Sequence, residues 1–62
     1  MKEYKEVIKE IRKIAGWREN NILDHLVKVE KVKAPADYEV LRFVSTDGTH
    51  FDYDTKSKQI TG

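Results

Sequence analysis

Three residues whose side chains suit metal binding or proton transfer stand at alternate positions near the end of the chain. They are His50, Asp52 and Asp54, within the run THFDYDTKSKQI. Side chains two residues apart on a strand point to the same face, so all three would share one surface. Imidazole and carboxylate groups bind metals and act as general acids or bases. One hypothesis is therefore a metal or proton-transfer site. The other is the solvent face of a strand whose opposite face carries Phe51 and Tyr53.

The turn before this strand decides between the two hypotheses. Asp47-Gly48 separates it from the preceding strand, YEVLRFVS, and two loop lengths suit such a turn. A two-residue loop would set Phe43 against Asp52 and bury carboxylates among apolar side chains, which is costly. A three-residue loop over residues 46–48, with Gly48 in the left-handed conformation, sets Phe43 against Phe51 and Leu41 against Tyr53. Because a slip by one residue exchanges the two faces of a strand, we predict the three-residue loop.

In this register the three candidate residues lie on the face away from the helix. Asp52 faces Arg42, His50 faces Val44 and Asp54 faces Val40. Same-face neighbours on a strand stand about 6.5–7 Å apart along the backbone, so a metal would need further ligands from elsewhere. The only other imidazole is that of His25. The sequence therefore predicts an exposed strand face, with no metal site and no cofactor.

Other chemistries find no support in the residue pattern. Ser45 and Ser57 lie in or beside predicted turns, Asp24 and His25 are adjacent and need not point together, and the chain has no glycine-rich loop to hold phosphate. The chain has no cysteine, which excludes disulfides and thiol redox chemistry. We predict no catalytic residues and no enzyme activity.

Length and charge narrow the remaining possibilities. The 62 residues predict one domain, 1–62, which hides only about 60% of the surface that its unfolded chain exposes. The formal net charge of +1 is too balanced for a protein that mainly neutralises phosphates. Residues 1–33 hold nine Lys or Arg against six Asp or Glu, so a nucleic-acid binder that uses this basic half is the alternative hypothesis. No apolar run reaches the length of a membrane span, and the chain as given suits the cytoplasm.

The elements that position these residues follow from hydrophobic periodicity. An apolar stripe predicts an N-terminal helix with ion pairs Glu6–Lys9 and Glu10–Lys13; its members are Tyr4, Val7, Ile8, Ile11, Ile14 and Ala15. Gly16 is expected to end it in the left-handed conformation, with Trp17 folded back on the last turn. Residues 17–26 are predicted as a short helical turn and linker, capped by Asn20 or Asn21.

The rest of the chain predicts strands. From Leu26 onward Val27 and Val29 alternate with charged residues, as in a half-buried strand, and residues 34–37 form a loop. The predicted fold is α+β, with one N-terminal helix packed on an antiparallel meander of three to four strands. Its predicted core consists of Ile8, Ile11, Val29, Leu41, Phe43, Phe51 and Tyr53.

The outer face of this sheet is the candidate binding surface. Apolar groups on it would form an exposed strip of the kind that marks a partner or dimer interface. The alternative is that β-branched residues simply favour strands on either face. The predicted partner-binding residues are Tyr38, Val40, Arg42 and Val44, with Val32 on the same side. The partner is another protein or a second copy of the chain.

The order of elements and several short motifs resemble the PepSY domain, a small module of bacterial and archaeal proteins. The resemblance spans nearly the whole chain and rests on Ala15-Gly16, Val27-Lys28-Val29-Glu30, Tyr38-Glu39-Val40, Asp47-Gly48, Phe51-Asp52-Tyr53-Asp54 and Thr55 to Ile60. Asp54, Ser57 and Ile60 fit the closing phrase of that family. Lys58 stands where the family prefers glycine, and lysine tolerates a positive φ poorly.

This resemblance implies a non-enzymatic module that binds or inhibits a partner, often a peptidase or its propeptide, outside the cytoplasm. It supplies no catalytic residues to carry over. A domain excised from such a protein would be extracytoplasmic. A free-standing cytoplasmic or virus-encoded regulatory protein is the other expectation.

Overall fold

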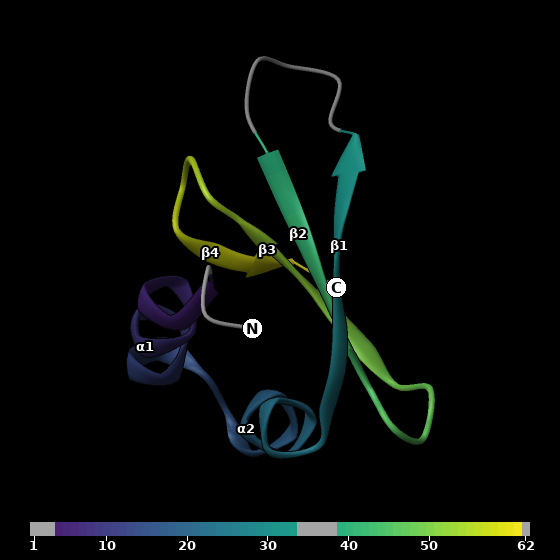
Figure 1. Cartoon of the computed structure of the whole chain (residues 1–62). Coiled ribbons are helices and arrows are strands. Elements are labelled where there is room, and N and C mark those ends of the chain that lie inside the picture. Colours follow the sequence, from purple (N-terminus) through teal and green to yellow (C-terminus); the bar gives the residue numbers. More distant parts are fainter. Residues whose placement is uncertain (1–3, 34–38, 62) are drawn as a thin grey trace.

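In the described part of the chain, two helices precede a four-stranded antiparallel sheet. A computed structural model describes residues 4–33 and 39–61. Its elements are α1 (Lys5–Ile14), α2 (Trp17–Asp24), β1 (Leu26–Lys33), β2 (Glu39–Ser45), β3 (His50–Asp54) and β4 (Gln59–Thr61). The strands lie in sequence order, so the sheet is a meander, and both helices lie on one side of it (Figure 1). The predicted α+β class is confirmed.

The β2–β3 hairpin has the predicted register. Phe43 pairs with Phe51 and Leu41 with Tyr53, while Arg42 pairs with Asp52 on the opposite face. The loop is closed by a hydrogen bond from the Ser45 N–H to the Thr49 carbonyl oxygen at 2.9 Å. Gly48 has φ 87°, the left-handed conformation expected of a glycine in this bulge. The hydrophobic pattern thus sets which residues face the helices.

A bulge in β1 changes the predicted pattern at its start. Leu26 pairs with Ser45, but the next pair is Lys28 with Val44, so Val27 is an extra residue. A bulge shifts the alternation of inward and outward side chains by one position. Leu26, before the bulge, and Val29, after it, therefore both face the helices. Val27 is left 51% exposed. The prediction that Val27 and Val29 share a face is therefore wrong, because alternation alone cannot reveal a bulge.

The junction between the helices also differs from the prediction. Gly16 has φ −84° and ψ −173°, an extended conformation, and serves as the N-cap of α2. The Glu19 side chain accepts the Gly16 N–H at 2.9 Å, and a Cβ on Gly16 would lie 3.0 Å from the same carboxylate oxygen. Glycine suits this position because the Glu19 carboxylate lies close to it and leaves little room for a side chain. The left-handed conformation expected there is wrong.

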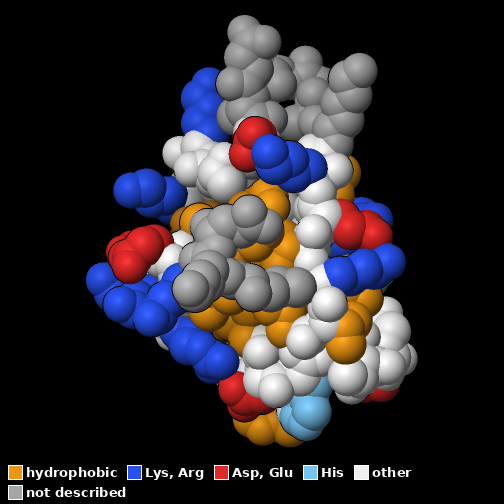
Figure 2. All heavy atoms as spheres, in the orientation of Figure 1, with side chains coloured by type: hydrophobic (Ala, Val, Ile, Leu, Met, Phe, Trp, Pro, Cys, Tyr) orange, Lys and Arg blue, Asp and Glu red, His pale blue; other side chains and the backbone are white. Residues whose placement is uncertain are grey.

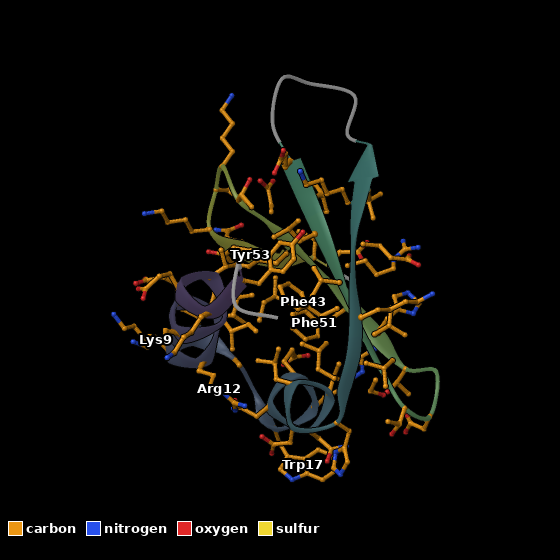
Figure 3. All side chains as sticks on the ribbon, in the orientation of Figure 1. Lys9, Arg12, Trp17, Phe43, Phe51 and Tyr53 are labelled. Carbon is orange, nitrogen blue, oxygen red and sulfur yellow. The ribbon has the colours of Figure 1, made fainter. Side chains whose placement is uncertain are left out.

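A full helix occupies the segment predicted as a short turn and linker. Its buried side chains are those of Ile22 and Leu23, which join the core, and its N-cap is Gly16, so the expected cap at Asn20 or Asn21 is wrong. Trp17 is 85% exposed and lies beneath α2, facing away from the sheet, so it does not fold back on α1 (Figure 3). Helix α2 therefore covers the sheet with its second half and leaves its first residue in solvent.

The core lies between the sheet and the two helices. Its buried members are Ile11, Ile22, Leu23, Leu41, Phe43, Phe51 and Tyr53. Of the predicted core residues, Ile8 and Val29 are only partly buried and pack against this cluster. Figure 3 shows Phe43, Phe51 and Tyr53 pointing from the strands into the space between sheet and helices. Two hydrogen bonds join α2 and its C-cap, His25, to the β2–β3 hairpin. The Arg18 side chain donates from Nη2 to the His50 carbonyl oxygen at 2.7 Å, and the Thr46 N–H donates to the His25 carbonyl oxygen at 2.9 Å.

Candidate functional site

The outer face of the sheet, on the side away from both helices, is the candidate site. Strand register places one row of side chains from each strand on it. From β1 to β4 they are Lys28, Glu30 and Val32; Val40, Arg42 and Val44; His50, Asp52 and Asp54; and Gln59 and Thr61. The face therefore combines three valines with charged groups of both signs.

Two ion pairs organise the charges on the outer face. Arg42 Nε and Nη2 donate to the two carboxylate oxygens of Asp52 at 2.9 and 3.3 Å. The hydrogen bond and the charge of Asp52 raise the pKa of Arg42. Lys28 Nζ lies 2.8 Å from Glu30 Oε1, and this contact lowers the pKa of Glu30. Charges that already have partners in the protein hold their side chains in place around the valines.

The residues that raised the metal hypothesis are not gathered into one site. Asp52 is held by Arg42, and Asp54 Oδ1 accepts the backbone N–H groups of Lys56 and Ser57 at 2.9 and 3.3 Å, which orders the β3–β4 turn. His50 is exposed and faces Val44. Over residues 4–33 and 39–61, no three His, Cys, Asp or Glu side chains are grouped as metal ligands would be. The expected absence of a metal requirement stays a prediction.

The valines of the outer face are half-buried by their neighbours. Val32 and Val40 are directly opposed on β1 and β2, and Val44 lies opposite Lys28 and His50. No strand or helix of the described chain stacks on this face (Figure 1). Val40, Arg42 and Val44 therefore share one surface, as predicted. Tyr38, the fourth predicted partner-binding residue, lies outside the described residues.

A polar cluster at the β2–β3 loop is a feature that the sequence analysis missed. Asp47 Oδ1 accepts hydrogen bonds from the Ser45 hydroxyl, from the Thr49 hydroxyl at 2.7 Å and from the Thr49 N–H at 3.1 Å. These donors, led by Ser45, lower the pKa of Asp47 from 3.8 to about 2. The signal in the sequence was an Asp with Ser two residues before it and Thr two residues after it. The hydrogen bonds of this cluster hold the β2–β3 loop in place, and the cluster does not resemble a catalytic triad.

Comparison with protein-family models, with curated proteins and with solved structures finds no match to this chain. In the described part of the chain, neither helix is long and apolar enough to cross a membrane. The functional interpretation therefore rests on the geometry of the faces and pockets of the molecule.

Proposed function

We propose that the chain is a small non-enzymatic binding module that presents the outer face of its sheet to another protein or to a second copy of itself. The observation that carries this proposal is that both helices lie on one side of the sheet, while Val32, Val40 and Val44 occupy the other. In residues 4–33 and 39–61, helices cover only one face of the sheet, which leaves these apolar groups partly in contact with water. A docked partner would remove them from water.

The arrangement of charges favours docking through this face over pairing at the edge of the sheet. Strand β1 is a sheet edge, but it carries Lys28 and Lys31 and a bulge at Val27. Lysines and bulges on an edge strand hinder the addition of another strand. On the outer face, by contrast, the Arg42–Asp52 pair is already formed and needs little reorganisation when a partner covers it.

The resemblance to PepSY domains supports the same proposal. A helix followed by a meander sheet is the order that this resemblance implies, and the family's role is to bind or restrain a protein such as a peptidase. The turn between β3 and β4 also forms, with Lys58 at φ 58° in the place of the family's glycine. In its specific form, the proposal is that the chain binds and inhibits a protein partner, as a PepSY-like module would.

Nucleic-acid binding through the basic first half is less well supported. Lys9, Lys13 and Arg18 lie 3.5–3.8 Å from Glu6, Glu10 and Glu19, and Arg12 Nη2 lies 3.0 Å from Asp24 Oδ1. Figure 2 shows a band of blue side chains on the left of the molecule, with red side chains at its ends. Phosphate binding would have to displace these carboxylates from their partners.

Substituting two valines tests the outer face directly. Val40→Lys combined with Val44→Lys places two charges in the proposed interface, while Asn21→Lys combined with Thr46→Lys adds the same charge at exposed positions elsewhere. Sedimentation equilibrium measures self-association, and affinity capture with each variant as bait measures partner binding. We expect the first variant to lose the complex and the second to keep it, with both retaining the circular dichroism spectrum of the parent.

Salt dependence separates this proposal from nucleic-acid binding. Docking through apolar groups changes little between about 50 and 200 mM salt, whereas phosphate contacts weaken steeply over that range. Equal complex formation by both double variants would contradict the proposal. If the parent binds RNA or DNA with an affinity that falls steeply as the salt concentration rises, nucleic-acid binding would replace this proposal.

A further inference from the structure

The β2–β3 loop contains the dipeptide Asp47-Gly48, the only place in the chain where glycine follows an aspartate or an asparagine. Both residues are exposed. An Asp-Gly bond in an unfolded peptide rearranges slowly to an isoaspartyl bond, because glycine has no side chain to hinder the approach of its nitrogen to the preceding carboxyl group. The sequence thus marks Asp47 for a spontaneous covalent change, and the fold sets its rate.

The rearrangement passes through a five-membered succinimide ring. The Gly48 nitrogen forms a bond to Asp47 Cγ, and one carboxyl oxygen leaves as water, which carries away the carboxyl proton and the Gly48 N–H proton. Water then opens the ring at one of its two carbonyl carbons. Attack at Cγ restores aspartate. Attack at the main-chain carbonyl carbon of Asp47 gives isoaspartate, in which the main chain runs through Cβ and Cγ.

The nitrogen that attacks in this reaction is engaged in the folded loop. The Gly48 N–H donates to the Ser45 carbonyl oxygen at 3.1 Å, and the Ser45 N–H donates to the Thr49 carbonyl oxygen at 2.9 Å. Gly48 has φ 87°, the conformation that suits the bulge. The Gly48 nitrogen must therefore give up a hydrogen bond of the turn before it can lose its proton.

The carboxyl group that is attacked is held as well. Asp47 Oδ1 accepts hydrogen bonds from the Ser45 hydroxyl, from the Thr49 hydroxyl at 2.7 Å and from the Thr49 N–H at 3.1 Å. Three donors on one oxygen restrict the rotation of the carboxyl group and favour its charged form. A charged carboxylate is a poor electrophile, because attack on it would have to expel an oxide ion. The reaction needs the protonated group.

The pKa of Asp47 determines how often the protonated group is present. The donors, led by the Ser45 hydroxyl, lower this pKa from 3.8 to about 2. At about pH 5, the change reduces the protonated fraction by more than about tenfold relative to an ordinary aspartate. The same hydrogen bonds therefore lower both the mobility and the reactivity of the carboxyl group.

We propose that Asp47 is a site of isoaspartate formation that the folded β2–β3 loop restrains, and that the hydrogen bonds from Ser45 and Thr49 supply the restraint. Isoaspartate adds one carbon atom to the main chain of the loop and moves the carboxylate away from the donors that bind it. The length of this loop sets the register of β2 and β3. The restraint thus preserves the loop on which the composition of both sheet faces depends.

Incubation of the full chain at about pH 5 tests the restraint. One sample is folded and the other is kept unfolded in guanidinium chloride, both at physiological temperature. Methylation by an isoaspartyl methyltransferase quantifies the product, and tandem mass spectrometry locates it at Asp47. We expect the folded sample to react more than about tenfold more slowly than the unfolded one. Equal rates in the two samples would overturn the proposal.

Two variants assign the restraint to the named donors. Ser45→Ala and Thr49→Val each remove one hydroxyl donor, and we expect each to speed the reaction of the folded protein severalfold while leaving the rate in guanidinium chloride unchanged. Thr46→Val is the matched control, since the Thr46 hydroxyl is not one of the Asp47 donors. Parent rates in both donor variants, or an equal acceleration by Thr46→Val, would overturn the proposal.

A loss of global stability is a second route to a faster reaction, because unfolded molecules react at the unfolded rate. Ile8→Ala controls for this route, since Ile8 packs against the core from α1 and lies far from the loop. Small additions of guanidinium chloride bring each folded variant to the same free energy of unfolding. At equal stability we expect Ser45→Ala and Thr49→Val to react faster than Ile8→Ala. Equal rates would show that the fold as a whole restrains the reaction and would overturn the role of the donors.

Discussion

The rings of Phe43 and Phe51 stack in the core, with centroids 5.2 Å apart and planes inclined by 16°. The two residues are directly opposed on β2 and β3, and both are fully buried. A slip by one residue would bring a charged side chain of β3 into this position. The stacked pair therefore links the register of the hairpin to the packing of the core, and through the register it decides which residues reach the outer face.

Removing one ring of this pair should severely destabilise the protein. We expect Phe51→Ala to lower the free energy of unfolding by about 3–5 kcal/mol, because it removes a buried ring and leaves a cavity. This is a large fraction of the total stability of a domain of this size. Urea unfolding followed by circular dichroism measures the change. Val27→Ala, at the exposed bulge residue, is the control and should stay within about 0.5 kcal/mol of the parent. Parent-like stability of Phe51→Ala would contradict the register.

The two ends of α2 should differ sharply in their contribution to stability. Ile22 is 1% exposed and Trp17 is 85% exposed. We therefore expect Ile22→Ala to cost about 2–5 kcal/mol and Trp17→Ala to cost less than about 0.5 kcal/mol. Thermal unfolding by circular dichroism suits both variants, since Trp17 is the only tryptophan. A large loss of stability in Trp17→Ala would show that the indole packs against the protein.

Asp47 should make the stability of the protein depend on pH in the acidic range. Its pKa is lowered to about 2 by the Ser45 and Thr49 donors, from an ordinary value of 3.8. The carboxylate therefore stabilises the folded state fully above about pH 4 and loses this effect as the pH falls through about 2. We expect the difference in unfolding free energy between the parent and Asp47→Asn to shrink over that window. Carbon NMR of the Asp47 carboxyl group gives the pKa directly, and a midpoint near 4 would contradict the expectation.

Lys58 should be a site where glycine stabilises the fold. Its φ of 58° is a left-handed conformation, which costs a residue with a Cβ about 1–2 kcal/mol. Glycine avoids this cost but loses more entropy on folding, so we expect Lys58→Gly to raise the unfolding free energy by about 0.5–1 kcal/mol. Ser57→Gly, in the same turn but without a positive φ, should lower it. Differential scanning calorimetry of both variants measures the contrast, and destabilisation by Lys58→Gly would show that the lysine side chain contributes more than the backbone strain removes.

Much of the sheet could be predicted because the signals for it, side-chain alternation and turn residues, lie within short segments and agree with one another. In β2 and β3 the apolar side chains alternate with polar ones, and only the three-residue loop with Gly48 keeps carboxylates out of the core. The same register places Val40, Arg42 and Val44 on the outer face. The α1 ion pairs Glu6–Lys9 and Glu10–Lys13 were predictable for the same reason, since i to i+3 spacing brings the side chains together on any helix.

Features that depend on how separate elements meet were beyond the sequence. Gly16 could have ended α1 in a left-handed turn or begun α2 in an extended one, and the Glu19 carboxylate that accepts its N–H favours the second. Ile22 and Leu23 are buried because α2 is fastened beneath the hairpin by Arg18 and the His25 carbonyl group. The same placement leaves Trp17 in solvent, where its size and apolar character alone would not put it.

The sequence by itself therefore determined the α+β class, the hairpin register and the composition of the outer face, because hydrophobic alternation and turn chemistry act over a few neighbouring residues. Only the tertiary structure decided the bulge at Val27, the docking of α2 and a pocket that Glu10 and Tyr53 line. These features bring together residues far apart in the chain. Their geometry follows from the packing of whole helices on a twisted sheet. The periodicity of a single segment therefore cannot predict it.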